Sequence, residues 1–349
     1  MTSITHCSLG YDLKQLFIGA EGTLGVVTGV SILTPPAPQA INNVILALPT
    51  FENVLPLFKL ARRHLSEILS AFEYIDRTAY DLSVKHGQGK GLSEDEIEGA
   101  ECFVLLETSG GKKEHDEEVR IPSTDAEPLT DVFPLKKLNS LLEILLESEQ
   151  PLITTGALSQ TPSQFASLWR LREGVPEAVS KEGKAYKYDI SIPIASFKEV
   201  VDKTKEQLGR KGLLCEDAVR HVVGYGHVGD GELVRISLHF HVDRLYPLAG
   251  NLHINIAAAA YTPEIESALE PFIYELVGES LDPDGVPWAQ AKHLSVASYK
   301  GSISAEHGIG AMKTHAMHYS KSGVAIDTMR RIKQVFDPHG IMNPGKVLE

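Results

Sequence analysis

The feature that most constrains this chain is a histidine motif divided by an intervening segment. The sequence reads His-Val-Gly-Asp-Gly from His227, and it resumes as Asn-Leu-His-Ile-Asn from Asn251. If residues 232–250 are left out, the halves join as one motif in which His227 and His253 are seven positions apart. The β-branched and apolar residues beside each half are typical of strands. The motif therefore predicts two strands that bring two imidazoles together across an insertion.

A third element, Ser-Ala-Glu-His-Gly, contains Glu306 and His307 near the end of the chain. Imidazole and carboxylate are both zinc ligands, and a catalytic zinc site keeps one position open for substrate. We therefore predict that His227, His253 and Glu306 bind a divalent metal ion. A neutral His307 beside that ion could take the proton of a 2-hydroxy group as a general base. The alternative role of His307 is to orient Glu306.

Fixed cations are needed to bind a carboxylate, and two candidates have apolar or aromatic neighbours. Arg172 lies in Leu-Trp-Arg-Leu-Arg-Glu-Gly, and Lys187 lies between two tyrosines. Arginine binds a carboxylate through two parallel hydrogen bonds, whereas lysine acts as a point charge. We predict that both bind substrate and that the tyrosines enclose Lys187. Each could instead be a solvated surface charge.

Composition restricts the partners. The chain has 349 residues, 43% hydrophobic and 23% charged, as in an ordinary globular protein, and its formal net charge is −13. This charge argues against nucleic acid or an anionic membrane as partner. No apolar run approaches the roughly 20 residues of a transmembrane helix. The three cysteines form no CxxC pair, so neither a disulfide framework nor an all-cysteine zinc site is expected.

The order of elements favours an α+β fold over a parallel doubly wound sheet, because strands and helices alternate in pairs. A glycine-rich loop at 19–25 precedes a β-branched run, which predicts a strand at 26–33 before a domain border at the prolines. Apolar periodicity predicts a helix over 51–72 and another over 163–181 that restarts at Pro176. Thr262 and Pro263 begin a helix expected to continue to residue 276.

At these residues the chain resembles the D-2-hydroxyglutarate dehydrogenases of the FAD-linked oxidase family, which also contains D-lactate dehydrogenases. The resemblance covers the C-terminal two-thirds of those proteins. It rests on three motifs, which are the divided histidine motif, Ser-Ala-Glu-His-Gly and Lys-Tyr-Asp. It implies an antiparallel sheet flanked by helices.

The same resemblance assigns roles to individual residues. It makes His227, His253 and Glu306 zinc ligands, and His307 the catalytic base. It places Arg172, Lys187 and Asn255 at substrate-binding positions. The loop that matches Gly-Ser-Glu-Gly-Thr-Leu-Gly-Val-Val-Thr implies that Glu21, Gly22, Gly25 and Val27 bind FAD. Near the end of the chain, Asn343 offers an amide to the same cofactor.

The implied domain organisation is a remnant of an FAD-binding domain at 1–36, followed by an FAD-linked oxidase C-terminal domain at 37–349. Most of the FAD-binding domain has no counterpart in this sequence. Insertions are expected at 232–250, which contains a further His-x-His at 239 and 241, and at 278–300. They are either surface loops or retained introns.

The implied reaction is FAD- and zinc-dependent oxidation of D-2-hydroxyglutarate to 2-oxoglutarate, with electron-transferring flavoprotein as an acceptor. The alternatives are a D-lactate dehydrogenase of the same family, or an inactive fragment that binds zinc or an acid without the flavin cradle. The resemblance implies the mitochondrial matrix, although no presequence is expected at this N-terminus.

Overall fold

The structure is a computed structural model that describes residues 10–65, 67–111, 117–118, 135–229, 249–278 and 301–348. It forms two compact units, each assembled from segments that are distant in sequence. Unit 1 comprises Met1–Pro35, Tyr188–Ile192 and Leu269–Glu349, and unit 2 comprises Pro36–Lys187 and Pro193–Ala268.

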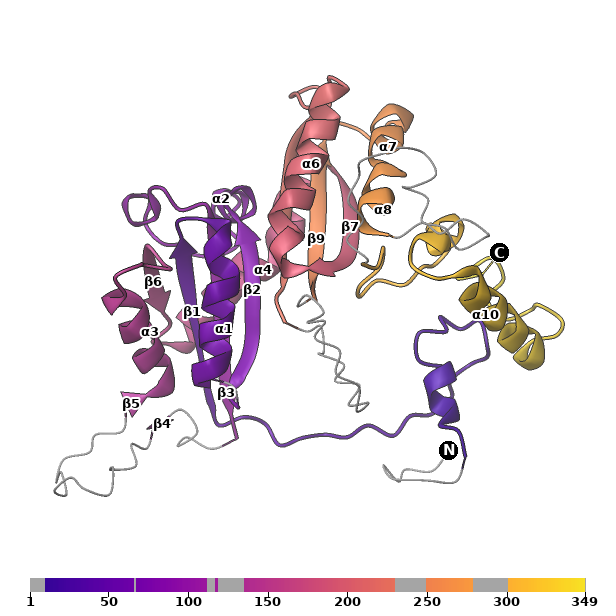
Figure 1. Ribbon diagram of the computed structural model, residues 1–349, viewed down its shortest axis with the longest axis horizontal. Helices are drawn as coiled ribbons and strands as arrows, with labels where there is room; N and C mark the ends of the chain where they lie inside the picture. The colour runs from indigo at the N-terminus through magenta and orange to yellow at the C-terminus, as the bar shows by residue number, and fades with distance from the viewer. Residues whose placement is uncertain are drawn as a thin grey trace, which may run out of the picture. The chain divides into compact units, whose positions relative to one another are not determined.

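Unit 2 is organised around an antiparallel sheet in the strand order β6-β1-β3-β2-β8-β9-β7 (Figure 1). The second half of β7 belongs to unit 1. The strands are β1 (Ala40–Leu48), β2 (Leu69–Asp76), β3 (Cys102–Gly110), β6 (Thr155–Leu158), β7 (Lys184–Pro193), β8 (Val219–His227) and β9 (Ala249–Ala258). Two further short strands, β4 (Glu117–Glu118) and β5 (Leu135–Lys136), pair with each other. The sheet with its helices confirms the predicted α+β class.

Helices cover both faces of this sheet. On one face lie α2, α4 and α5, and on the other lie α1, α3 and α6. The helices of unit 2 are α1 (Val54–Leu65), α2 (Arg77–Lys85), α3 (Lys137–Glu147), α4 (Pro162–Glu173), α5 (Val175–Lys181), α6 (Phe197–Arg210) and α7 (Pro263–Leu269), with 3-10 helices η2 (Phe51–Asn53), η3 (Glu94–Ile97) and η5 (Ile194–Ser196). The restart at Pro176 is confirmed, because α4 ends at Glu173 and α5 begins at Val175.

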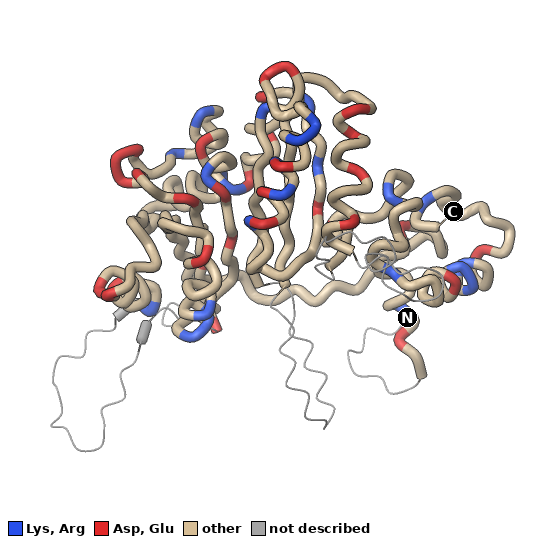
Figure 2. The backbone as a smooth tube through the Cα atoms, turned by 45° about the horizontal axis from the view of Figure 1, so that its top comes forward, with Lys and Arg blue, Asp and Glu red and all other residues tan. Residues whose placement is uncertain are grey.

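The core follows from side chains that alternate along strands covered on both faces. Ile45 and Phe103 pack with α2, α4 and α5, whereas their buried neighbours Leu46 and Val104 have the opposite orientation. Most charged positions of unit 2 lie on helices and connecting loops (Figure 2). A charged side chain buried in this sheet is therefore an exception that requires an explanation.

The topology repeats one arrangement. Helix α1 connects β1 to β2, and β3 lies between those strands; likewise α6 connects β7 to β8, and β9 lies between them. The two arrangements meet where β2 pairs with β8. At this junction the carboxyl group of Asp76 caps α2 through the amide of Ala79 and also accepts the Gly224 amide of β8. Burial raises the pKa of Asp76 to about 6.

Unit 1 contains shorter elements around the second half of β7. They are η1 (Leu13–Leu16), α8 (Phe272–Val277), η6 (Thr314–Tyr319) and α10 (Gly323–Phe336). Lys333 of α10 donates from Nζ to the carbonyl oxygens of Thr23 and Met342, both at 2.7 Å. This lysine therefore fixes the loop after residue 19 against the C-terminal segment.

Three predicted elements were wrong. Residues 26–33 belong to no sheet within the described ranges, and side chains there, such as Ile32, are exposed. The helix expected over 51–72 ends at Leu65, because Leu69–Asp76 forms β2 in the middle of the sheet. The helix expected to reach 276 is interrupted at Pro271, which has no amide hydrogen to continue it.

The described residues on either side of each expected insertion are paired with each other through the backbone. Val228 forms an antiparallel bridge with Gly250, and the Gly301 amide donates to the Val277 carbonyl at 2.9 Å. Strand β9 begins at Ala249. Residues 230–248, with the histidines at 239 and 241, and residues 279–300 lie outside the described residues. Across the described helices, none combines the length and apolarity that a membrane span requires.

Candidate metal centre and flavin pocket

His227 stands at the end of β8, opposite Glu73 of β2 in the strand register. Its Nδ1 is hydrogen-bonded to Oε1 of Glu73. A carboxylate at Nδ1 favours the tautomer that carries its proton there and directs the lone pair of Nε2 outward. This carboxylate–histidine pair is typical of a metal-binding imidazole.

His253 lies on β9 opposite Tyr225 of β8, on the same face of the sheet as His227. The ring centroids of His227 and His253 are 6.2 Å apart, and a nitrogen of one ring lies within 4.8 Å of a nitrogen of the other. Small changes of side-chain torsion would bring both onto one ion at zinc–nitrogen distances of about 2.1 Å. The sequence prediction that these histidines converge across residues 232–250 is confirmed.

Glu73 is almost completely buried and has a second ionic partner. Arg172, at the end of α4, donates from Nε to its Oε2 at 2.7 Å, and the guanidinium lies 4.7 Å from the centre of the Tyr225 ring. Burial opposes ionisation of Glu73, but the hydrogen bond to His227 and the Arg172 charge outweigh it and lower the pKa of Glu73. The guanidinium carries two further NH₂ groups that can bind a ligand carboxylate.

The two other predicted substrate-binding residues differ in their surroundings. Asn255 is buried on β9 and donates from Nδ2 to the hydroxyl of Tyr225 at 2.8 Å. Lys187 is exposed, so the expectation that its neighbouring tyrosines enclose it was wrong. Tyr186 instead accepts the Thr262 amide through its hydroxyl.

In unit 1, Glu306 and His307 lie on a loop whose backbone is held by a buried carboxylate. Oδ2 of Asp189, on β7, accepts the amides of Ala305, Glu306 and His307 at 3.1, 2.7 and 2.6 Å. Asp189 is 1% exposed. Three backbone donors on one carboxylate oxygen fix the course of this loop, while the side chains of Glu306 and His307 are exposed.

A second carboxylate fixes the continuation of the same loop. Glu21 accepts the amides of Ile309 and Gly310 at 2.7 and 2.8 Å, and its carbonyl accepts Nδ2 of Asn343. A side chain at Gly308 would collide with the Glu21 carboxyl group. The side chain of Glu21 therefore supports the loop of His307, and its role toward a cofactor stays a prediction.

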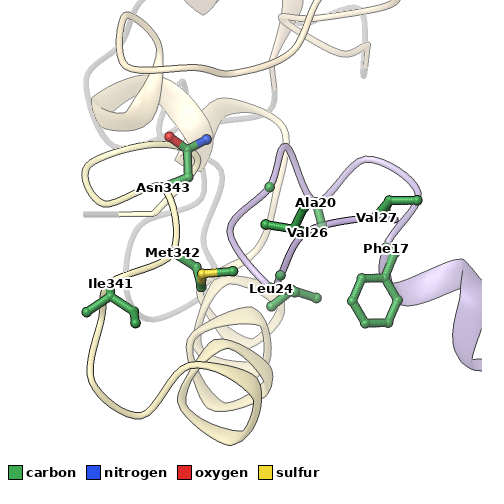
Figure 3. A pocket seen from close by; sticks show the side chains of 10 residues that line it. Phe17, Ala20, Leu24, Val26, Val27, Ile341, Met342 and Asn343 are labelled. Atoms are coloured by element: carbon green, nitrogen blue, oxygen red, sulfur yellow. The ribbon is translucent and has the colours of Figure 1, made fainter. Parts of the chain in front are cut away.

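Beside Glu21, unit 1 contains a largely apolar cavity of about 450 Å³. Segments 17–27 and 341–343 face each other across it, with Met342 directed toward Leu24 (Figure 3). The lining includes most of the predicted FAD-binding residues, namely Gly22, Gly25, Val27 and Asn343. Its size and apolar lining fit a planar aromatic ring system such as that of a flavin.

Sequence reasoning missed Glu73 and Asp189 as supporting residues. Glu73 directly follows a stretch that was predicted to be helical, so nothing indicated that it faces His227. Asp189 was contained in the Lys-Tyr-Asp element, which gave a signal without a role. Both carboxylates act on the predicted site residues from elements far away in the sequence.

Comparison with known proteins agrees with this fold. The chain aligns with two structures of alkyldihydroxyacetonephosphate synthase at TM-scores of 0.51 and 0.53, with 14% sequence identity, over 97% of this chain and 50% and 49% of those chains. The sequence matches the family of FAD linked oxidases, C-terminal domain, over residues 37–347. The chain therefore belongs to the FAD-linked oxidase family.

Curated relatives give the same result. The chain is 39% identical to a putative mitochondrial D-lactate dehydrogenase of Schizosaccharomyces pombe, over 99% of this chain and 55% of that protein. It is 38% identical to the mitochondrial D-2-hydroxyglutarate dehydrogenase of Bos taurus, over 100% and 51%. It is 39% identical to a D-2-hydroxyglutarate–pyruvate transhydrogenase of Saccharomyces cerevisiae, over 97% and 57%. The chain thus spans about half the length of these relatives.

Proposed function

We propose that this chain carries the substrate- and metal-binding part of an FAD- and zinc-dependent dehydrogenase that oxidises D-2-hydroxyglutarate to 2-oxoglutarate. The observation that carries the proposal is the Glu73–His227 pair with His253 on the adjacent strand. The names of the relatives in Bos taurus and Saccharomyces cerevisiae support the substrate.

In this proposal His227, His253 and Glu306 hold one zinc ion, whose donor set of two imidazoles and a carboxylate is that of a catalytic site with an open position. When bound, zinc would supply a Lewis acid for the 2-hydroxy oxygen. Arg172, Lys187 and Asn255 bind the substrate, and His307 takes the hydroxyl proton through its imidazole. Asp189 and Glu21 hold the His307 loop in place.

For the flavin, we propose that the backbone of Glu21 with Gly22, Gly25, Val27 and Asn343 would hold the ring of FAD, which when bound would supply the hydride acceptor for the oxidation. Residues 1–36 would then be part of an FAD-binding domain, and 37–349 the FAD-linked oxidase C-terminal domain. We further propose that the protein is located in the mitochondrial matrix, as the names of its mitochondrial relatives suggest. We also propose that electron-transferring flavoprotein is its electron acceptor.

The metal part is tested on the purified chain by zinc analysis after dialysis. We expect about one zinc per chain, lost in His253→Gln and retained in His64→Gln, a control on α1 of the same unit. Flavin absorbance and dye reduction with D-2-hydroxyglutarate, with FAD added, are measured on the same samples. Zinc without flavin or turnover would support the alternative of an inactive zinc-binding fragment.

D-lactate dehydrogenase is the second candidate, favoured by the name of the Schizosaccharomyces pombe relative. The two substrates differ by one carboxylate, which needs an additional cation. Lys187→Ala should weaken binding of D-2-hydroxyglutarate more than binding of D-lactate. Equal losses for the two acids would remove the argument for hydroxyglutarate.

A further inference from the structure

Asn251 is a buried polar side chain whose role the site described above does not explain. It is 7% exposed, and neither its Oδ1 nor its Nδ2 has a hydrogen-bond partner within the described ranges. A carboxamide offers two donors and an acceptor that takes two hydrogen bonds. Buried polar groups in folded proteins are nearly always paired, with protein, water or a ligand. The unpaired amide therefore points to a ligand.

The strand register places Asn251 beside both histidines. Tyr225 pairs with His253 and Val228 with Gly250, so Asn251 lies opposite His227. It also precedes His253 by two residues, and alternation along β9 puts both on one face. A side chain at Gly226 would collide with the backbone of Asn251, so β8 and β9 approach closely at this point. Asn251 is thus held next to the proposed zinc ligands by backbone pairing.

Asn255 provides an internal comparison. It lies on the same face of β9, two residues after His253, and is also buried. Its Nδ2 donates to Tyr225 within the protein at 2.8 Å. The two asparagines flank one histidine symmetrically, yet Asn255 has a protein partner for its amide and Asn251 has none among the described residues. This difference singles out Asn251 for an external ligand.

We propose that Asn251 is a further substrate-binding residue, whose Nδ2 donates to an oxygen of the 2-hydroxy acid bound at the histidine pair. This inference rests on the proposed function. An amide suits that position because it carries no charge of its own beside a cation and an anionic ligand. A purely structural asparagine would have protein partners, and its removal would destabilise the fold. For Asn251 we expect the opposite: its replacement should weaken binding of the 2-hydroxy acid without lowering the stability of the fold.

The test measures binding by calorimetry in the purified chain without flavin, so that no turnover occurs. Zinc is titrated first, and D-2-hydroxyglutarate is then titrated into the zinc-loaded chain. For Asn251→Leu we expect unchanged zinc affinity, an affinity for the acid weaker by about 10- to 100-fold, and a melting temperature that is unchanged or higher. Asn251→Asp keeps the shape of the side chain but adds a negative charge, so it should lower the affinity for D-2-hydroxyglutarate further.

Asn43→Leu is the matched control, because Asn43 is a fully buried asparagine on β1 of the same sheet, with its Nδ2 bound to the Phe165 carbonyl. It should lower the melting temperature and leave affinity for the acid unchanged. Wild-type affinity for the acid in both Asn251 variants, with zinc bound, would overturn the inference alone. If the wild-type chain binds neither zinc nor the acid, the proposed function itself fails and this inference with it.

Discussion

Replacing Glu73 by glutamine removes the buried carboxylate that is hydrogen-bonded to both Arg172 and His227. The guanidinium of Arg172 then stays buried without its carboxylate, which should lower the free energy of unfolding by about 3 kcal/mol. His227 loses the partner that fixes its tautomer, so zinc affinity should fall about 10- to 100-fold. Urea denaturation and competition with a chromophoric chelator measure the two effects.

Glu107→Gln is the control for that experiment. Glu107 lies on β3 of the same sheet and accepts the indole Nε1–H of Trp169 at 2.7 Å, away from the histidines in the strand register. We expect a smaller loss of stability, about 1 kcal/mol, and normal zinc affinity. Wild-type zinc affinity in Glu73→Gln would show that the carboxylate does not support the metal site.

These residues also mark how much of the site the sequence could predict. His227 and His253 were found because a spaced histidine motif is visible without the fold, and Asn255 because a family resemblance covered it. Glu73 could not be found, since a single acid in an apolar stretch has no signature until β2 is known to pair with β8. Exposure of Lys187 was also unpredictable, because flanking tyrosines do not determine which way a strand residue faces.

At the scale of elements, the loop of Glu306 and His307 depends on Asp189 of β7. In Asp189→Asn the three backbone amides lose a charged acceptor, and the buried Lys313 loses an anionic neighbour. We expect faster hydrogen exchange at the amides of residues 305–307, and a loss of about 1–3 kcal/mol in stability. Exchange read by mass spectrometry on peptides that cover residues 301–312 measures the local effect.

The control is another carboxylate of unit 1 that holds backbone amides. Asp337 accepts the amides of Ile341 and Met342 at 3.0 and 2.8 Å. Asp337→Asn should therefore accelerate exchange at residues 341–342 and leave 305–307 unchanged, the opposite pattern to Asp189→Asn. Uniform acceleration in both variants would mean that these carboxylates stabilise unit 1 as a whole and do not act on separate loops.

The elements that the sequence predicted well are those whose signal is local. Strands β8 and β9 carry apolar and β-branched runs beside the two halves of the histidine motif, and the restart of the helix after Glu173 follows from Pro176. The first half of β2 was included in the helix predicted over 51–72, because Leu69 and Phe72 are spaced as on one face of a helix. The second half of β2 is buried although it contains Glu73 and Asp76. The strand expected at 26–33 has the right composition, but strand formation also requires a paired neighbour, which no composition reveals.

For the whole molecule, the change of unit at Pro35 lies at the prolines where the sequence predicts a border, whereas the other changes of unit fall within β7 and α7 and leave no sign in the composition. The insertion expected at 232–250 has a signal in the sequence, because removing these residues restores an uninterrupted motif. That operation also has a structural meaning. In a chain without residues 232–250, Gly231 would take the place of Gly250 and pair with Val228. Gly229 and Asp230 would then form a two-residue turn between β8 and β9.

A chain lacking residues 232–250 should therefore fold and bind zinc. Two-residue hairpin turns of type II′ have glycine with positive φ at the first position, and Gly229 has φ of 104°. Shortening the connection reduces the entropy lost on closing it, so stability should rise by up to about 2 kcal/mol. Zinc affinity should match the full chain, because His227 and His253 are placed by strand register. Measurement is by urea denaturation and zinc titration of both chains.

The matched control deletes the same residues and also replaces Gly229 by valine. A β-branched side chain at positive φ is strained, and the space there is already occupied by the ring of Phe58. This variant should lose the gain in stability, whereas zinc affinity should fall only if the hairpin shifts its register. If instead the simple deletion abolishes zinc binding while the chain remains folded, residues 232–250 themselves contribute to the metal centre. The divided motif would then be a functional part of the site and not an interruption of it.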